Sequence, residues 1–100
     1  MRVLLCVACF GASCGVAAAQ QPPADPARAK ASFESICAVC HGVAGEGGVG
    51  LPLKNITERL TLEQTIDKIK NPHPTMPKLY PAVLSEAEVA SIAEYIRTLR

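Results

Sequence analysis

The sequence predicts an all-α fold, and three observations lead to that expectation. Apolar residues recur with helical spacing in three segments, and two of these segments open with a capping box, the pairing of a Ser or Thr with a Glu or Gln three residues later. No stretch alternates apolar and polar residues over the length of a strand. Glycines and prolines, 7 and 8 of the 100 residues, separate the helical segments as loops. A chain of this length forms one small domain.

Residues 1–19 have the features of a cleaved export signal. One basic residue precedes an apolar run at about 3–10, and the alanines at 17–19 satisfy the small-x-small rule of signal peptidase. The apolar run is short for a membrane span, and the second half of the stretch is rich in small residues. We therefore expect cleavage after residue 19, a linker at 20–24, no membrane span in the mature chain and a periplasmic location. A retained anchor and a lipid-modified leader cysteine are the weaker alternatives.

The folded domain is expected over residues 25–100, and its first helix at about 27–38. Asp25 followed by Pro26 is typical of an N-cap and a first helical position, because the carboxylate accepts from free N–H groups and proline needs no partner there. One apolar face of this helix is formed by Ala29, Phe33, Ile36 and Cys40.

A glycine-rich loop follows, and then a second helix. Residues 42–54 hold five glycines and a proline, which excludes a regular helix or strand there. Asn55 is expected to cap a short turn that ends at about residue 59. Thr61 and Gln64 form a capping box, ahead of three apolar residues expected to be buried: Leu62, Ile66 and Ile69.

The last helix begins after a proline-rich segment. Prolines at 72, 74 and 77 prevent residues 71–77 from being helical. Ser85 and Glu88 form the second capping box. Behind it, one helical face is expected to contain Val89, Ile92, Ile96 and Leu99.

Charge and cysteine content limit the functions that the chain can have. The formal net charge is +1 and no basic tract occurs, so the sequence gives no support for nucleic-acid binding through a cationic surface. Cleavage of the leader leaves two of the 5 cysteines, Cys37 and Cys40. Two lone cysteines in an oxidising compartment normally form a disulfide. The residue that follows them, His41, favours a different role.

Residues 37–41, Cys-Ala-Val-Cys-His, form the C-x-x-C-H motif of covalent haem attachment. Two thiols at this spacing can each add to one vinyl group of the porphyrin, and His41 then becomes the proximal iron ligand. A thioredoxin-like redox pair would instead open a helix after a strand, and here the cysteines end a helix. A structural zinc site needs four ligands, whereas this domain offers two cysteines and two histidines, with Cys40 and His41 adjacent.

Residues 25–100 resemble a class I monohaem cytochrome c of the small bacterial periplasmic type. The resemblance rests on the Cys-Ala-Val-Cys-His motif, the loop at 42–50 with the Leu-Pro-Leu that follows, the Met76-Pro77 pair, and the stretch at 92–96. It implies three to four helices wrapped around one covalently bound haem c. It further implies that the first and last helices cross, with Phe33 and Tyr95 at the crossing.

The resemblance also assigns two residues to the iron site. Met76 becomes the second axial ligand, and the carbonyl of Pro52 accepts the ring N–H of His41. The stiff proline-rich loop supports the assignment of Met76, although a lone methionine can also simply fill space. His73 lies between two prolines of the same loop and is expected to support the loop or face solvent, with a bis-histidine haem as the alternative.

A haem bound on both sides by His41 and Met76 has no open position for a substrate. The sequence therefore predicts a soluble electron carrier rather than an enzyme, expected as a monomer. Its partners would be a donor and an acceptor redox protein, such as a dehydrogenase or reductase and an oxidase or peroxidase. Two alternatives remain open: a small haem subunit held in a dehydrogenase or oxidase complex, and a haem enzyme or gas-binding protein in which Met76 dissociates.

Overall fold

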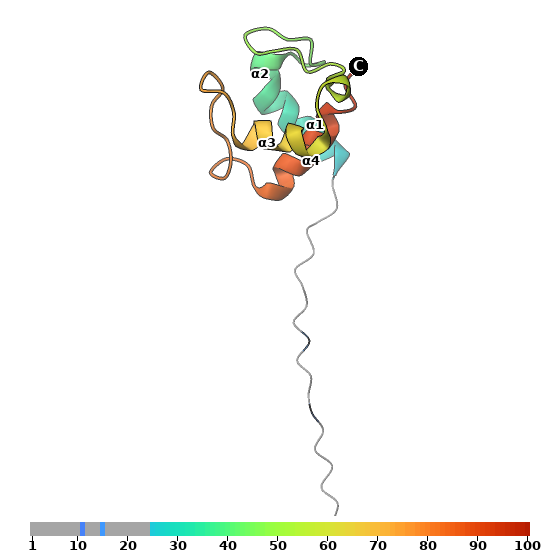
Figure 1. Cartoon of the computed structure of the whole chain (residues 1–100), viewed down its shortest axis with the longest axis vertical. Coiled ribbons are helices and arrows are strands. Elements are labelled where there is room, and N and C mark those ends of the chain that lie inside the picture. The colour runs from blue at the N-terminus through green and yellow to red at the C-terminus, as the bar shows by residue number, and fades with distance from the viewer. Residues whose placement is uncertain (1–10, 12–14, 16–24) are drawn as a thin grey trace, which may run out of the picture.

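The computed structural model describes residues 25–100, together with Gly11 and Gly15. The predicted export signal at 1–19 and the linker at 20–24 otherwise lie outside the described residues and stay predictions. All regular elements in the described part of the chain are helical, which confirms the all-α prediction (Figure 1). Within that same part, no helix is long and apolar enough to cross a membrane.

The first helix begins as the sequence predicts. Helix α1 spans Pro26–Ser32, and the Asp25 side chain accepts from the N–H groups of Ala27 and Arg28, at 3.0 and 3.3 Å. This cap satisfies two of the N–H groups that have no partner inside the helix. The predicted cap and first helical position are therefore confirmed.

The same helix contains a π-helical turn that the sequence did not predict. The turn covers Phe33–Cys37, and a further helical turn, α2 (Ala38–His41), continues directly from it. The Ala38 N–H donates to the carbonyl of Phe33, five residues back rather than four. A π turn inserts one extra residue into a helix and often occurs beside a functional site. Here the turn ends at Cys37, the first cysteine of the motif, and α2 contains the second cysteine and the histidine.

Helices α3 (Leu62–Lys70) and α4 (Glu86–Ile96) begin at the predicted capping boxes. The Thr61 hydroxyl accepts from the Gln64 N–H, and the Gln64 side chain accepts in return. Ser85 and Glu88 form the same pair of bonds at the start of α4. Helix α4 ends at Ile96, so Leu99 lies in the tail beyond it. The segment between α3 and α4 contains no helix, as the prolines predict.

The short turn before α3 is present, but its predicted cap is wrong. Residues Ile56–Glu58 form a 3₁₀ turn. Asn55 has a φ of 57° and makes no side-chain cap bond to the turn. Its backbone N–H donates to the Leu99 carbonyl at 2.9 Å. Asn tolerates this left-handed conformation better than most residues. The position therefore anchors the C-terminal tail rather than capping the turn.

The core forms where α1 and α3 both pack on α4. Phe33 is fully buried, and its ring lies 5.3 Å from that of Tyr95 at an angle of 57°, a tilted aromatic contact. The predicted crossing of the first and last helices is thereby confirmed. The buried cluster consists of Phe33, Ile56, Ile69, Leu84, Val89, Ile92, Ala93 and Ile96.

The buried face of α3 differs from the predicted one. Ile69 is buried as expected, but Leu62 and Ile66 are only half-buried. Thr65 is buried instead, and its hydroxyl donates to the Thr61 carbonyl at 2.9 Å. That bond satisfies the hydroxyl inside the apolar core. The helix thus keeps two apolar side chains partly exposed.

Candidate functional site

The five-residue motif spans the end of the π turn and all of α2. Cys37 is the last residue of the π turn, and Cys40 and His41 are on α2. All three side chains are half-buried. Within the described residues, neither of these two thiols forms a disulfide. Burial raises the pKa of the Cys37 thiol to about 11, which keeps this thiol protonated near neutral pH.

The glycine-rich loop at 42–50 holds the end of this helix in place. Gly42 N–H donates to the Ala38 carbonyl, Gly47 N–H to the His41 carbonyl, and Gly50 N–H to the Cys40 carbonyl, each at 2.8 Å. The last carbonyls of a helix have no partner within the helix. The backbone N–H groups of the loop supply those partners and hold the end of α2 against the loop.

One hydrogen bond determines which ring nitrogen of His41 is available. Nδ1 of His41 lies 2.7 Å from the carbonyl oxygen of Leu51. Because a carbonyl can only accept, Nδ1 must donate its hydrogen, and the lone pair is then on Nε2. This is the arrangement of a metal-binding histidine, in which the second nitrogen is held by a backbone acceptor.

The acceptor is Leu51, so the prediction of Pro52 is wrong by one residue. The Pro52 carbonyl instead accepts from Nη2 of Arg59, at 3.0 Å. Neighbouring carbonyls in a non-helical segment point in different directions, so only one of the two can face the ring. The residue directly after Gly50 faces it, and Gly50 is the signal that would have identified the position.

Gly50 lies against the His41 ring. A Cβ at this position would be 2.7 Å from Cε1 and 2.8 Å from Nδ1 of His41, too close for any real contact. The glycine is needed here for close approach of backbone to ring. The backbone around residues 50 and 51 therefore forms a shaped seat for the imidazole.

Replacing Gly50 by alanine is expected to move the His41 ring and weaken its bond to Leu51. We expect a loss of about 1–3 kcal/mol in the free energy of unfolding of the holoprotein, the usual cost of overpacking. Thermal unfolding followed by haem absorbance measures it. Gly48→Ala is the matched control, because its new Cβ would meet only the Cys40 carbonyl, at 3.2 Å. Equal losses in the two variants would show that the close approach is unimportant.

The surroundings of the motif fit a flat, largely apolar cofactor. Like Cys37, several apolar side chains that pack against the core are only partly buried: Ile36, Leu53, Leu60, Leu62, Ile66 and Leu79. Val39, Val43, Val49 and Leu51, on α2 and the loop around His41, are exposed. Two free thiols, one imidazole with a free Nε2 and this apolar setting match the requirements of a covalently bound haem.

Two alternative interpretations of the cysteines gain nothing from the structure. No group of three or more His, Cys, Asp and Glu side chains that could hold a metal ion occurs among residues 25–100, as a zinc site would require. The cysteine pair follows a helix and not a strand, unlike a thioredoxin-like site.

Met76 and His73 lie on the segment between α3 and α4, drawn in orange in Figure 1. Met76 is half-buried, and its backbone N–H donates to the His73 carbonyl at 2.9 Å. The exposed His73 ring bonds through Nδ1 to the Thr75 hydroxyl at 3.1 Å. The Thr75 N–H also donates to Nδ1, at 3.4 Å. His73 thus supports its own loop, as predicted, and Met76 keeps its role as a predicted ligand.

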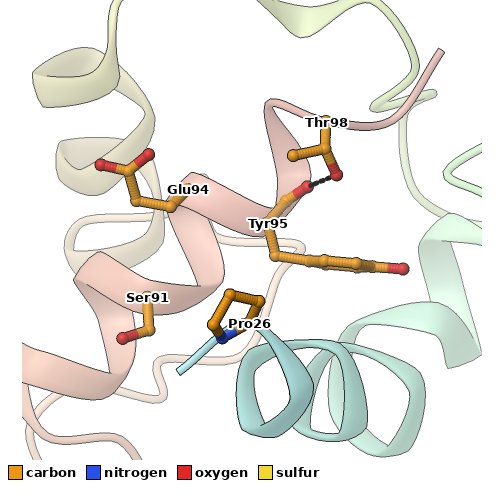
Figure 2. A pocket seen from close by; sticks show the side chains of 5 residues that line it. All are labelled: Pro26, Ser91, Glu94, Tyr95 and Thr98. Atoms are coloured by element: carbon orange, nitrogen blue, oxygen red, sulfur yellow. Dashed lines mark hydrogen bonds between the residues drawn. The ribbon is translucent and has the colours of Figure 1, made fainter. Parts of the chain in front are cut away.

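Two shallow hollows on the surface lie away from the motif. The first, of about 260 Å³, is lined by Pro26, Ser91, Glu94, Tyr95 and Thr98 (Figure 2). The second, of similar volume, lies between α1 and the start of α4. Neither is lined by a cysteine or histidine.

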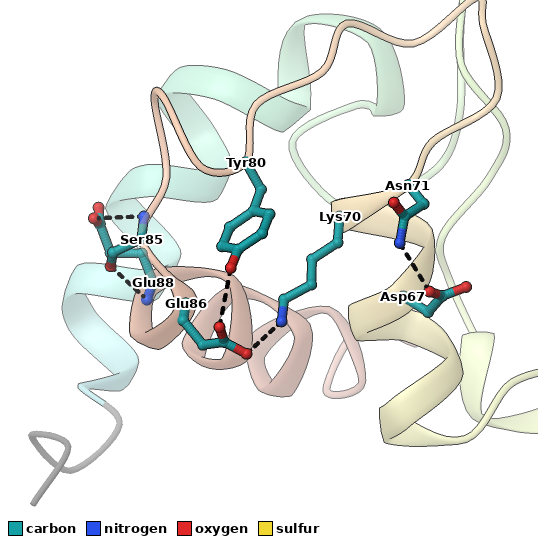
Figure 3. A network of polar contacts seen from close by, with 7 residues as sticks. All are labelled: Asp67, Lys70, Asn71, Tyr80, Ser85, Glu86 and Glu88. Atoms are coloured by element: carbon teal, nitrogen blue, oxygen red, sulfur yellow. Dashed lines mark hydrogen bonds and ion pairs between the residues drawn. The ribbon is translucent and has the colours of Figure 1, made fainter.

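Sequence reasoning missed a cluster of three side chains at the ends of the Met76 segment. Lys70, the last residue of α3, bonds to the carboxylate of Glu86, the first residue of α4. The Tyr80 hydroxyl donates to the other oxygen of that carboxylate, at 3.0 Å (Figure 3). These contacts join residues 6 and 16 positions apart, beyond the spacing of any helical or capping pattern, so the sequence does not predict them.

A family model and a known protein both match this chain over most of its length. The family model described as cytochrome c oxidase, cbb3-type, subunit III matches residues 24–96. A cytochrome c-553-like protein of Synechocystis sp. is 32% identical over 76 residues, which cover 75% of this chain and 70% of that protein.

Two solved structures share the fold at 20% sequence identity. The c-type cytochrome NirC has a TM-score of 0.60, with 71% of this chain and 86% of that chain covered. Cytochrome CL from the methylotroph Methylophaga aminisulfidivorans has a TM-score of 0.55, with 72% of this chain and 51% of that chain covered. With the motif, the helical fold and these likenesses together, the chain belongs to the class I cytochromes c, the haem-bearing family of electron carriers.

Proposed function

We propose that the protein carries single electrons between redox proteins of the periplasm, after export directed by residues 1–19. In this proposal Cys37 and Cys40 hold one haem c covalently, and His41 and Met76 bind its iron from opposite sides. The observation that carries the proposal is the His41–Leu51 hydrogen bond of 2.7 Å, because it leaves the lone pair of Nε2 available on the residue that directly follows Cys40. When bound, the haem supplies the Fe(II)/Fe(III) chemistry.

The residues of the chain would determine the orientation of the iron ligands, the reduction potential and the access of small molecules to the iron. The Leu51 carbonyl keeps the His41 proton on Nδ1 and fixes the orientation of the ring. The thioether of Met76 is a neutral, soft ligand, and it favours the reduced iron and a raised potential. If His41 and Met76 both held the iron, they would leave no position for oxygen or peroxide. The proposed role is therefore electron transfer without catalysis.

Covalent attachment is the first test of this proposal. We expect the haem to stay with the chain through acid–acetone extraction and denaturing electrophoresis, because both thiols are consumed by thioether formation. The mass of the mature protein should equal residues 20–100 plus one haem. A haem that separates under these conditions would refute the proposed site.

Ligand binding distinguishes a carrier from a haem enzyme or gas-binding protein. The reduced protein at neutral pH is expected to bind carbon monoxide slowly or not at all, since Met76 occupies the position that the gas needs. Rapid binding would instead favour a labile Met76 and the catalytic alternative.

A subunit of a larger complex is the second candidate, and the matching family model favours it. That model describes subunit III of a cbb3-type oxidase. Size-exclusion chromatography of material purified at low salt separates the two cases, because a free carrier elutes as a small monomer and a subunit elutes with its complex.

A further inference from the structure

The segment between α3 and α4 is held at its base by a basal cluster of three side chains, Lys70, Tyr80 and Glu86. Each carboxylate oxygen of Glu86 receives one partner: Lys70 Nζ on Oε1 and the Tyr80 hydroxyl on Oε2, the latter at 3.0 Å. Lys70 Nζ also lies 4.8 Å from the centre of the Tyr80 ring. Each of the three therefore contacts both of the others (Figure 3).

The basal cluster shortens the free part of the segment. The half-buried side chains of Leu79 and Tyr80 pack against the core, and the Leu79 carbonyl accepts from the N–H groups of Val83 and Leu84, at 2.8 and 2.9 Å. Residues 81–85 are thus tied locally. At the other end, the Asn71 N–H donates to the Asp67 carbonyl at 2.8 Å, so residues 72–78, which include Met76, span between two fixed ends.

The free span is stiff, so the positions of its two ends determine where Met76 lies. Prolines at 72, 74 and 77 fix three backbone φ angles. The Met76 N–H also donates to the His73 carbonyl, a backbone bond that does not depend on the His73 side chain. Because the prolines leave the span few free backbone angles, a displacement at Tyr80 is expected to be passed on to Met76. Loss of the contacts that Tyr80 makes with Glu86 and Lys70 would therefore displace the Met76 thioether.

We propose that Lys70, Tyr80 and Glu86 are positioning residues for the sixth iron ligand, Met76. Their mutual contacts join the two ends of the loop and so hold the Met76 thioether in place. This inference rests on the proposed function, in which Met76 binds the iron. The Lys70 ammonium and the Tyr80 hydroxyl also hold the pKa of the Glu86 carboxyl below its ordinary value, so the carboxylate stays charged at neutral pH.

The test compares Tyr80→Phe and Glu86→Ala with the unaltered holoprotein. Tyr80→Phe removes one hydrogen bond and keeps the ring, whereas Glu86→Ala removes both bonds of the carboxylate. We expect the affinity of the oxidised protein for free imidazole to rise about threefold in the first variant and about tenfold in the second, in line with one and two lost hydrogen bonds. The charge-transfer band at the red end of the oxidised spectrum, which reports methionine ligation, should weaken in the same order.

Two control variants separate positioning from other effects. Glu94→Ala removes the same charge from an exposed site on α4 and should leave the band and the imidazole affinity unchanged. Thr61→Ala breaks the capping box at the far end of α3 and should lower the unfolding temperature without opening the iron to imidazole.

The outcomes distinguish this inference from the proposed function. If the band is present and Tyr80→Phe and Glu86→Ala behave like Glu94→Ala, the positioning role is wrong and the electron carrier stands. If the unaltered protein has no such band, Met76 is not a ligand, and both proposals fall. Equal imidazole binding by Thr61→Ala and Glu86→Ala would also overturn the inference, because general destabilisation would then explain the effect.

Discussion

A chain in which Cys37 and Cys40 are both replaced by alanine is expected to lack a fixed tertiary structure. Its mature form would have about 80 residues, a size at which the core of a domain is only marginally sufficient. The largest fully buried side chains are Phe33, Leu84, Ile92 and Val89, a single aromatic and three aliphatic residues. Several further apolar side chains that pack against this core are only partly buried. The covalently held haem must therefore supply a large part of the buried apolar surface.

Near-ultraviolet circular dichroism and thermal unfolding measure this loss. The control is the unaltered sequence of residues 20–100 made without export and hence without attached haem, which should behave like the double variant. That agreement would assign the loss to the haem and not to the two thiols. Cooperative unfolding of the double variant at a temperature close to that of the holoprotein would contradict the prediction.

Met76→Ala is expected to change the ligation, the potential and the gas binding of the iron together. A thioether binds Fe(II) better than Fe(III), and it gives a weak charge-transfer band at the red end of the oxidised spectrum that an imidazole does not give. Removal of the thioether should abolish the band, lower the reduction potential and allow carbon monoxide to bind the reduced protein. Visible spectroscopy, redox titration and a carbon monoxide titration follow the three effects.

His73→Ala is the matched control, because His73 lies on the same loop and bonds only to Thr75 and the loop backbone. It should leave the band, the potential and the carbon monoxide affinity nearly unchanged. The opposite pattern, in which His73→Ala abolishes the low-spin spectrum and Met76→Ala does not, would mean a bis-histidine haem. The proposal of a high-potential carrier would then be wrong.

Features determined by neighbouring residues could be predicted from the sequence. A capping box joins residues three apart, and both boxes occur at the helix starts where Thr61 and Ser85 predict them. The Asp25 cap is equally local. The motif at residues 37–41 is also recognisable by itself, since its chemistry requires that spacing in any fold.

Features determined by distant contacts could not be predicted in the same way. A loop has no period, so nothing local decides whether Leu51 or Pro52 points its carbonyl at His41. The basal cluster joins α3 and α4 across the whole Met76 segment, and its members look like ordinary surface residues in the sequence. The π turn contains neither glycine nor proline, the residues that usually signal an irregular helix.

The π turn changes the rotation about the helix axis between α1 and α2. In a regular helix, each residue added turns everything after it by about 100° around the axis. The extra residue at Phe33–Cys37 therefore shifts the directions of Cys40 and His41 relative to the face of α1 that packs on α4. Exposed positions such as Glu34 can accept other side chains without changing this rotation. The number of residues in the turn is the constrained quantity, because losing one would leave α1 seated on α4 while rotating the histidine away from its loop.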